Sequence, residues 1–245
     1  MSRSALPRPC AAMALLACIG LCACGPFRSL PREAALVPGD EHPLLVMDFT
    51  EPLPLDPLPA GWHHRTFFGV DPMEIESVER DGRHALRLAT QAGGSMLFRF
   101  VDVPLAEYPV LHWQWLIEQP VVTNIDERTV AGDDHPARIY LRFADAEGEE
   151  HALELIWGNR HLAAGDWLHL GFLFGLVEFP HYVVNGGEAQ ARRWHRERVD
   201  LSDLYRTLWG EPNGVRITDV ALFCDTDQTD TESIAYFADL RLARE

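Results

Sequence analysis

The chain has 245 residues, of which 47% are hydrophobic and 24% are charged, and its formal net charge is −16. This length and apolar content suit one large β domain or two small ones, and they are sufficient to bury a core. The acidic excess argues against a nucleic-acid partner, because binding to phosphates requires a basic face.

The N-terminal segment, residues 1–23, has the pattern of a bacterial lipoprotein signal peptide. Arg3 and Arg8 precede the apolar run AAMALLACIGLCA, which is too short and too rich in small residues to span a membrane. The run ends in LCAC, which fits a lipobox with Cys24 as the lipidated residue, although LLAC, which ends at Cys18, also fits. A plain secretory signal is the alternative. Because Gly25 is not the Asp that often retains lipoproteins at the inner membrane, we expect a lipid-anchored protein that faces the periplasm at the outer membrane.

Residues 24–43 are predicted to form a tether, because prolines at positions 26, 31, 38 and 43 prevent regular structure. After removal of the leader, Cys24 and Cys224 are the remaining cysteines. With Cys24 acylated, Cys224 has no disulfide partner, and its apolar neighbours predict a small buried side chain.

From Leu44 onward the sequence predicts a single domain, residues 44–245, that consists almost entirely of β-strands. Alternating or apolar segments between turn residues predict strands at 44–49, 66–70, 73–79, 84–90, 95–103, 110–118, 137–145, 151–158, 215–225 and 233–243. This number of short strands predicts an all-β fold, a β-sandwich.

Three further segments are less regular. The run 167–179 suits a buried strand with bends at its glycines, and 190–200 fits either a strand or a helix. One helix is predicted at 200–210, because Asp200 or Ser202 can cap its start and Gly210 can end it.

Trp113 and Trp115 are two residues apart and therefore share one face of a strand. On an exposed face they would form a platform for stacking sugar rings. Their neighbours on that face are Leu111 and Ile117, so we predict that both tryptophans lie in the core.

The stretch AGDDHPARIY contains the first candidate site. Asp133 and Asp134 follow a glycine, and Arg138 and Tyr140 point to one side of the next strand. Adjacent carboxylates repel each other, so they require a cation or an arginine nearby. Together with Asp227 they are predicted to form a polar ligand-binding pocket; an ion pair that fixes the loop to the sheet is the alternative.

The stretch ALFCDTDQTD contains the second candidate site. Oxygens of Asp225, Asp227 and Thr229 alternate along the chain and could converge on Ca²⁺. A polar turn in which these side chains accept hydrogen bonds from nearby amides is the alternative.

Two resemblances to known families support the prediction of a β-sandwich. The opening LLVMDF, the strand HALRLAT and the closing segment ITDVALFCD resemble jelly-roll carbohydrate-binding domains with a galactose-binding-like fold. More specifically, W-Q-W at 113–115, AGDD with ARIY at 131–140 and DTDQT at 225–229 resemble the bacterial family DUF3047, over roughly residues 44–243. Gln228 stands where the family pattern has Asn, and LIE follows the tryptophans in place of RVE.

The resemblance implies a jelly-roll-like sandwich and, by analogy of fold, a carbohydrate ligand. We therefore expect a non-catalytic domain that binds a glycan or another component of the cell envelope. A hydrolase that acts on envelope polysaccharide through the acidic residues is one alternative, since two carboxyl groups can hydrolyse a glycoside. A structural or assembly lipoprotein with a protein partner is the other.

Overall fold

The computed structural model describes residues 32, 34–40, 42–172 and 177–245. The predicted signal peptide and Cys24 lie outside the described residues. No helix within the described ranges is long and apolar enough to cross a membrane.

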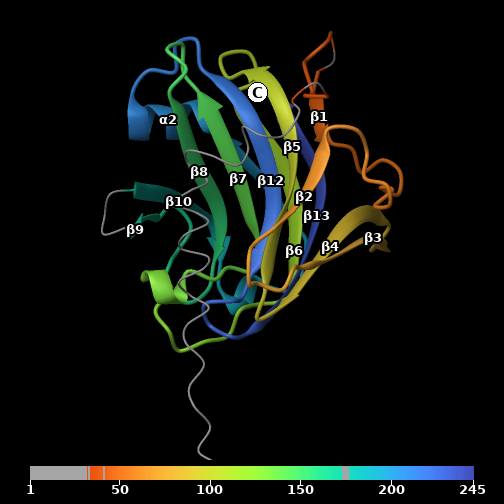
Figure 1. The fold of residues 1–245 in the computed structure, drawn as a ribbon, viewed down its shortest axis with the longest axis vertical. Coiled ribbons are helices and arrows are strands. Elements are labelled where there is room, and N and C mark those ends of the chain that lie inside the picture. Colours follow the sequence, from red (N-terminus) through yellow and green to blue (C-terminus); the bar gives the residue numbers. More distant parts are fainter. Residues whose placement is uncertain (1–31, 33, 41, 173–176) are drawn as a thin grey trace, which may run out of the picture.

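Two β-sheets form the fold (Figure 1). The strands of the six-stranded sheet are β1 (Leu44–Met47), β3 (Glu74–Arg80), β4 (Arg83–Gln91), β6 (Val110–Gln119), β11 (His195–Asp200) and β13 (Glu232–Ala243). Their order is β11-β6-β13-β4-β3, and β1 pairs with β13.

The seven-stranded sheet packs against the first. Its strands are β2 (Trp62–Thr66), β5 (Gly94–Pro104), β7 (Arg138–Ala144), β8 (Glu150–Gly158), β9 (Trp167–Phe172), β10 (Val177–Gly186) and β12 (Arg216–Asp225). Their order is β2-β5-β12-β7-β8-β10-β9, with β10 and β8 parallel. The predicted all-β sandwich is therefore confirmed.

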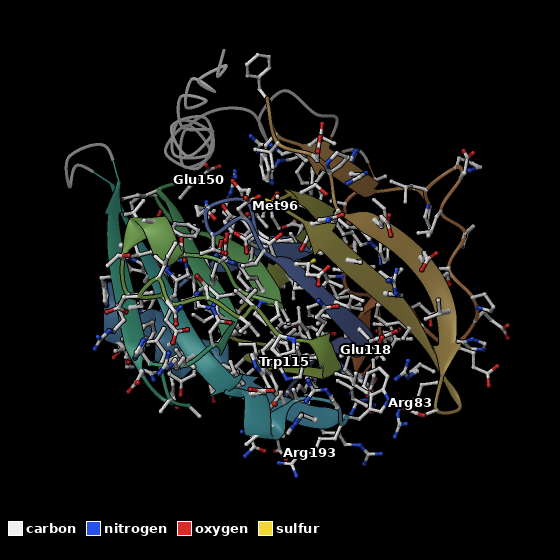
Figure 2. The ribbon with its side chains drawn as sticks, turned by 90° about the horizontal axis from the view of Figure 1, so that it is seen from below. Arg83, Met96, Trp115, Glu118, Glu150 and Arg193 are labelled. Carbon is white, nitrogen blue, oxygen red and sulfur yellow. The ribbon has the colours of Figure 1, made fainter. Side chains whose placement is uncertain are left out.

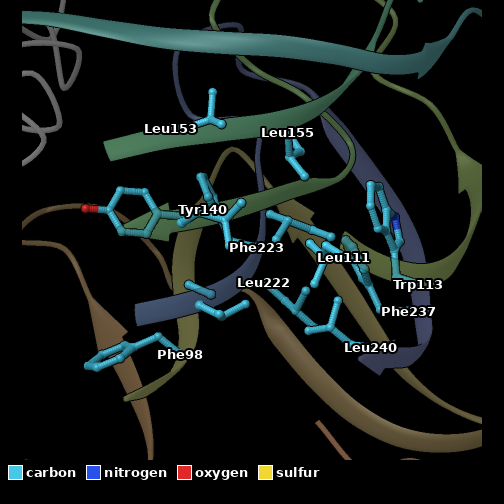
Figure 3. Close-up of a cluster of buried hydrophobic side chains, with 14 of the residues drawn as sticks. Phe98, Leu111, Trp113, Tyr140, Leu153, Leu155, Leu222, Phe223, Phe237 and Leu240 are labelled. Atoms are coloured by element: carbon cyan, nitrogen blue, oxygen red, sulfur yellow. The ribbon is translucent and has the colours of Figure 1, made fainter. Parts of the chain in front are cut away.

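The core lies between the sheets, where alternate residues of the facing strands meet (Figure 3). Trp113 and Trp115 are 1% and 0% exposed, which confirms their prediction as core residues. Trp115 of the six-stranded sheet lies 5.7 Å, centroid to centroid, from Trp157 of the seven-stranded sheet, in an edge-to-face arrangement. Figure 2 shows Trp115 inside the molecule, whereas Arg83 and Arg193 lie at its periphery.

The helical segments are short: η2 (Val130–Gly132), η3 (Glu188–Gln190) and α2 (Leu201–Trp209). Helix α2 begins where the carboxylate of Asp200 accepts a hydrogen bond from the amide of Asp203, and it ends at Gly210, whose φ is 97°. Both boundaries match the prediction, because capping oxygens and left-handed glycines mark helix ends.

Two strands differ from their predicted positions. The sequence predicts a strand at 66–70, but the strand in this region is β2, which ends at Thr66. Residues 67–70 instead form a turn, in which the amide of Val70 donates a hydrogen bond to the carbonyl oxygen of Phe67. The apolar pair Phe67–Phe68 suggested a strand, yet Phe68 is 88% exposed. The run 167–179 is divided between β9 and β10, and β10 continues to Gly186 beyond the predicted end.

The described part of the predicted tether contacts the sandwich. Leu36 forms a parallel bridge with Val101 of β5, through two backbone hydrogen bonds of 2.9 and 2.8 Å. The guanidinium of Arg32 lies 3.5 Å from a carboxylate oxygen of Asp219 and above the ring of Phe100. Val101 lies seven residues along β5 from Gly94, which corresponds to roughly 23 Å.

Candidate functional site

The candidate site lies at one end of the seven-stranded sheet, the lower end in Figure 1. Strand β12 ends there at Asp225, which pairs with Gly94 at the start of β5. Strand β7 begins at the same end, where Arg138 pairs with Phe223. The antiparallel register thus brings together two candidate segments that are separated by about ninety residues of sequence.

Arg138 is the centre of a buried network of ion pairs. Its Nε donates to Asp225 Oδ1 at 2.9 Å, and its Nη1 donates to Glu154 Oε2 at 2.7 Å. Its Nη2 donates to Asp133 Oδ1 at 3.1 Å and also to the Asp133 carbonyl oxygen. Arg138 is only 1% exposed, and its guanidinium lies over the ring of Phe223. The ion pair considered from the sequence is therefore present, with three carboxylates around one guanidinium.

Two histidines complete this network. His181 Nε2 lies 3.2 Å from Glu154 Oε2 and 3.7 Å from Asp133 Oδ1. Burial alone would lower the pKa of His181, but the charges of Asp133 and Glu154 outweigh it and raise that pKa. His135 is fully buried as well, and its Nδ1 lies 2.9 Å from the carbonyl oxygen of Trp157.

Asp134, Asp225 and Asp227 form a second acidic group beside Arg138; we call these three residues the acidic triad. Each offers a carboxylate oxygen, and the three oxygens lie within 4.8 Å of one another. Burial, together with the charge of Asp134, raises the pKa of Asp227 to about 7. Burial also raises the pKa of Asp134 and of Asp225, in spite of the Arg138 charge. The triad therefore resists holding three negative charges on its own.

The predicted residues take different positions in this arrangement. Thr229 donates to Asp134 Oδ2 through both its amide and its hydroxyl, each at 2.6 Å, so its oxygen holds an acidic side chain. Tyr140 lies further along β7, where its hydroxyl accepts from Arg142 Nε at 3.3 Å and its ring stacks on Phe179. Asp133, Asp134, Arg138, Asp225 and Asp227 are brought together, with the first four almost completely buried.

Sequence reasoning did not identify Glu154, His181 or Glu127. Glu154 lies within the apolar strand segment HALELIWG. A charged residue between two apolar neighbours of a buried strand could have identified it as part of a buried ion pair. His181 lies in the part of β10 that the sequence analysis did not assign to a strand. Its pairing with Glu154 across two strands depends on register, which the local pattern does not give.

Glu127 fixes a neighbouring loop. Its Oε1 accepts hydrogen bonds from the amides of Arg160 at 2.7 Å and Leu162 at 3.0 Å, and also from that of His161. Its Oε2 accepts from the amide of Asn159 at 2.5 Å. Since Glu127 is 1% exposed, one buried carboxylate satisfies four successive backbone donors.

An open groove of about 400 Å³ adjoins this loop, between segments 120–127, 159–161 and 187–188. Val122 and Ile125, which are 73% and 41% exposed, contribute apolar surface to it. Its polar lining includes Asn124, Arg160 and His161. Asn159 connects the groove to the triad, because its side-chain amide donates to the carbonyl oxygen of Asp134 at 2.6 Å.

Solved structures with a similar outline include two carbohydrate-binding modules of Clostridium thermocellum. The family 11 module of a cellulosomal cellulase has 7% identity and a TM-score of 0.41, with 79% of this chain and 93% of that chain covered. The family 30 module of another cellulosomal cellulase has 11% identity and a TM-score of 0.43, with 83% and 98% covered. The xyloglucanase domain of the effector NopAA of Sinorhizobium fredii has 11% identity and a TM-score of 0.42, with 74% and 92% covered. These values assign no ligand and no activity to this chain.

The comparison with curated proteins gives no match. A family model described as "Protein of unknown function (DUF3047)" matches residues 60–241, which include the WQW segment, the Arg138 network and the acidic triad. The chain is therefore a member of the DUF3047 family.

Proposed function

We propose that this protein is a lipid-anchored domain facing the periplasm that binds a neutral glycan of the cell envelope, without catalysis, in the groove between segments 120–127 and 159–161. The proposal rests on the combination of apolar and polar side chains that line this groove. Exposed Val122 and Ile125 lie beside the polar side chains of Asn124, Arg160 and His161. A sugar ring presents the same combination, an apolar face bordered by hydroxyl groups.

The backbone around the groove is held in place before a ligand arrives. Glu127 binds four successive amides of the 159–162 loop, and Asn159 joins that loop to Asp134. A groove that is already ordered loses less conformational entropy on binding, which favours affinity. In this proposal Asp133, Asp134 and Arg138 support the binding loops and do not contact the sugar.

The charge of the chain restricts the ligand. A formal net charge of −16 repels polyanionic glycans over distances of about a Debye length, roughly 8 Å at physiological ionic strength. An uncharged oligosaccharide meets no such barrier. The predicted leader, residues 1–23, supports the proposed location, because a lipoprotein signal peptide would direct the domain to the compartment where envelope glycans occur.

A glycan array with the purified chain in detergent, followed by isothermal titration calorimetry of the strongest neutral oligosaccharide, tests the proposal. We expect Asn124→Ala and His161→Ala each to weaken binding about tenfold or more, which corresponds to the loss of one good hydrogen bond. His112→Ala, on the six-stranded sheet, serves as the control and should bind normally. Release of reducing ends from the glycan would instead support a hydrolase. Binding that is unchanged in both groove variants would exclude this groove.

A further inference from the structure

The acidic triad has an arrangement of oxygens that suits a metal ion. Asp225 ends β12, Asp227 follows in the next turn, and Asp134 approaches from the loop before β7. Their nearest oxygens lie within 4.8 Å of one another. Two ligands on opposite sides of Ca²⁺ lie about 4.6 to 5.2 Å apart, so these separations fit around one such ion.

A second observation points to a missing partner. Both carboxylate oxygens of Asp227 are shielded from solvent and accept no hydrogen bond from the described residues. The amide oxygen of the adjacent Gln228 is shielded and unpaired in the same way. Desolvating a carboxylate without a partner costs several kcal/mol, so such groups are normally paired or bound to a metal. One loop thus presents three oxygens that lack a donor.

The carboxylate of Asp227 lies close to the backbone of β5 at Gly94. A Cβ at Gly94 would lie 3.5 Å from Asp227 Oδ1 and 3.1 Å from Asp225 Cβ. Because Gly94 has no side chain, this space stays free for the acidic groups. Thr229 and the amide of Gln228 hold Asp134 from the other side.

The balance of charged groups around the triad also favours a bound cation. Asp133, Asp134, Glu154, Asp225 and Asp227 contribute five carboxyl groups to the described cluster. Arg138, His135 and His181 contribute at most three positive charges. When all five carboxyl groups are ionised, the buried cluster has a surplus of at least two negative charges, which a divalent cation would offset.

We propose that Asp134, Asp225 and Asp227 bind a hard divalent cation, Ca²⁺, at the end of the seven-stranded sheet. Carboxylate oxygens favour hard cations over soft metals, and Ca²⁺ accepts irregular oxygen coordination, whereas Mg²⁺ requires a nearly ideal octahedron. The ion joins the 225–229 turn to the loop before β7, and so orders the end of the sheet beside the groove. This inference stands independently of the glycan ligand.

Thermal unfolding of the purified chain, first stripped with EDTA and then supplied with CaCl₂ or MgCl₂, tests the site. At a hundredfold excess over Kd, Ca²⁺ should raise Tm by about 5 to 10 °C, and Mg²⁺ should raise it less. Asp227→Asn removes one ligand charge at nearly constant shape. We expect this variant to lose the Ca²⁺-induced shift while its Tm in EDTA equals or exceeds that of the wild type, since repulsion within the triad is relieved.

Asp230→Asn is the matched control, because it makes the same change at an exposed position of the same turn. It should keep the full Ca²⁺ shift. Luminescence of Tb³⁺, a Ca²⁺ substitute, provides a direct second readout, and it should be lost in Asp227→Asn alone. Absence of any Ca²⁺ effect on the wild type, or an undiminished effect in Asp227→Asn, would overturn the proposal. Neither result depends on glycan binding.

Discussion

Arg138 and Glu154 form an ion pair across adjacent strands of the seven-stranded sheet, with Nη1 and Oε2 2.7 Å apart and both side chains almost completely buried. Asp133 and Asp225 share the same guanidinium. The guanidinium of Arg138 therefore compensates three buried carboxylates from different segments of the chain. Its removal would destabilise the fold, because these buried charges would lose their main compensating cation.

Replacing Arg138 by Met should therefore destabilise the fold severely. The variant keeps most of the side-chain volume but removes the guanidinium that Asp133, Glu154 and Asp225 share, and we expect a loss of about 3 to 5 kcal/mol in the free energy of unfolding. Urea denaturation followed by circular dichroism measures it. Arg128→Met, which removes an exposed ion pair with Asp126, is the control and should leave the urea midpoint unchanged.

Glu127 should keep the 159–162 loop, which borders the groove, in a fixed conformation. In Glu127→Gln the two carboxylate acceptors become one carbonyl oxygen, so some of the amides of residues 159–162 lose their partner. Hydrogen–deuterium exchange at these amides should become faster, and stability should fall by about 1 to 3 kcal/mol. Glu188→Gln changes an exposed groove residue in the same way and should leave exchange unaltered. Unchanged protection in Glu127→Gln would show that the loop is ordered by other contacts.

His181 should make stability depend on pH in a defined direction. Glu154 and Asp133 raise its pKa in the folded protein, with Arg138 and the Phe179 carbonyl as its other polar neighbours. A histidine whose folded pKa exceeds its unfolded value of about 6.5 stabilises the fold below that pH, and this contribution is lost as the pH rises through the folded pKa.

The comparison of wild type with His181→Gln isolates this contribution. The destabilisation caused by the substitution should be larger at pH 6 than at pH 9, measured by urea denaturation at both values. An equal or opposite difference would mean that folding does not raise the pKa of His181. His151→Gln, at a histidine that lies on the ring of Trp209, gives the comparison at a site away from the Arg138 network.

Local patterns in the sequence predicted most of the fold. The two-residue spacing of Trp113 and Trp115 identified a buried face, and Asp200 and Gly210 marked both ends of the helix, because these features depend on neighbours along the chain. The position of β2 was wrong because its residues, WHHRT, are mostly polar, as suits a strand at the edge of a sheet.

The candidate site could be predicted only in part. Asp133, Asp134, Arg138 and Asp227 were placed together on the basis of charge, and the structure brings them together. Their burial, and the partners Glu154 and His181, follow from the register of β7, β8 and β10, which is set by contacts between distant segments. The orientation of Glu127 toward the 159–162 loop depends in the same way on a contact made over thirty residues of chain.

If Cys24 is lipidated as proposed, the bridge between Leu36 and Val101 would limit how far the sandwich can extend from a bilayer. Leu36 lies twelve positions after Cys24, and a fully extended chain of that length reaches about 40 Å. With a lipid on Cys24, as proposed, the sandwich would stay within about one domain diameter of the membrane. Because Leu36 attaches well along β5 from Gly94, the acidic triad and the groove lie at the far end of that strand from the attachment point, and with the proposed anchor the groove would stay open to molecules of the periplasmic space.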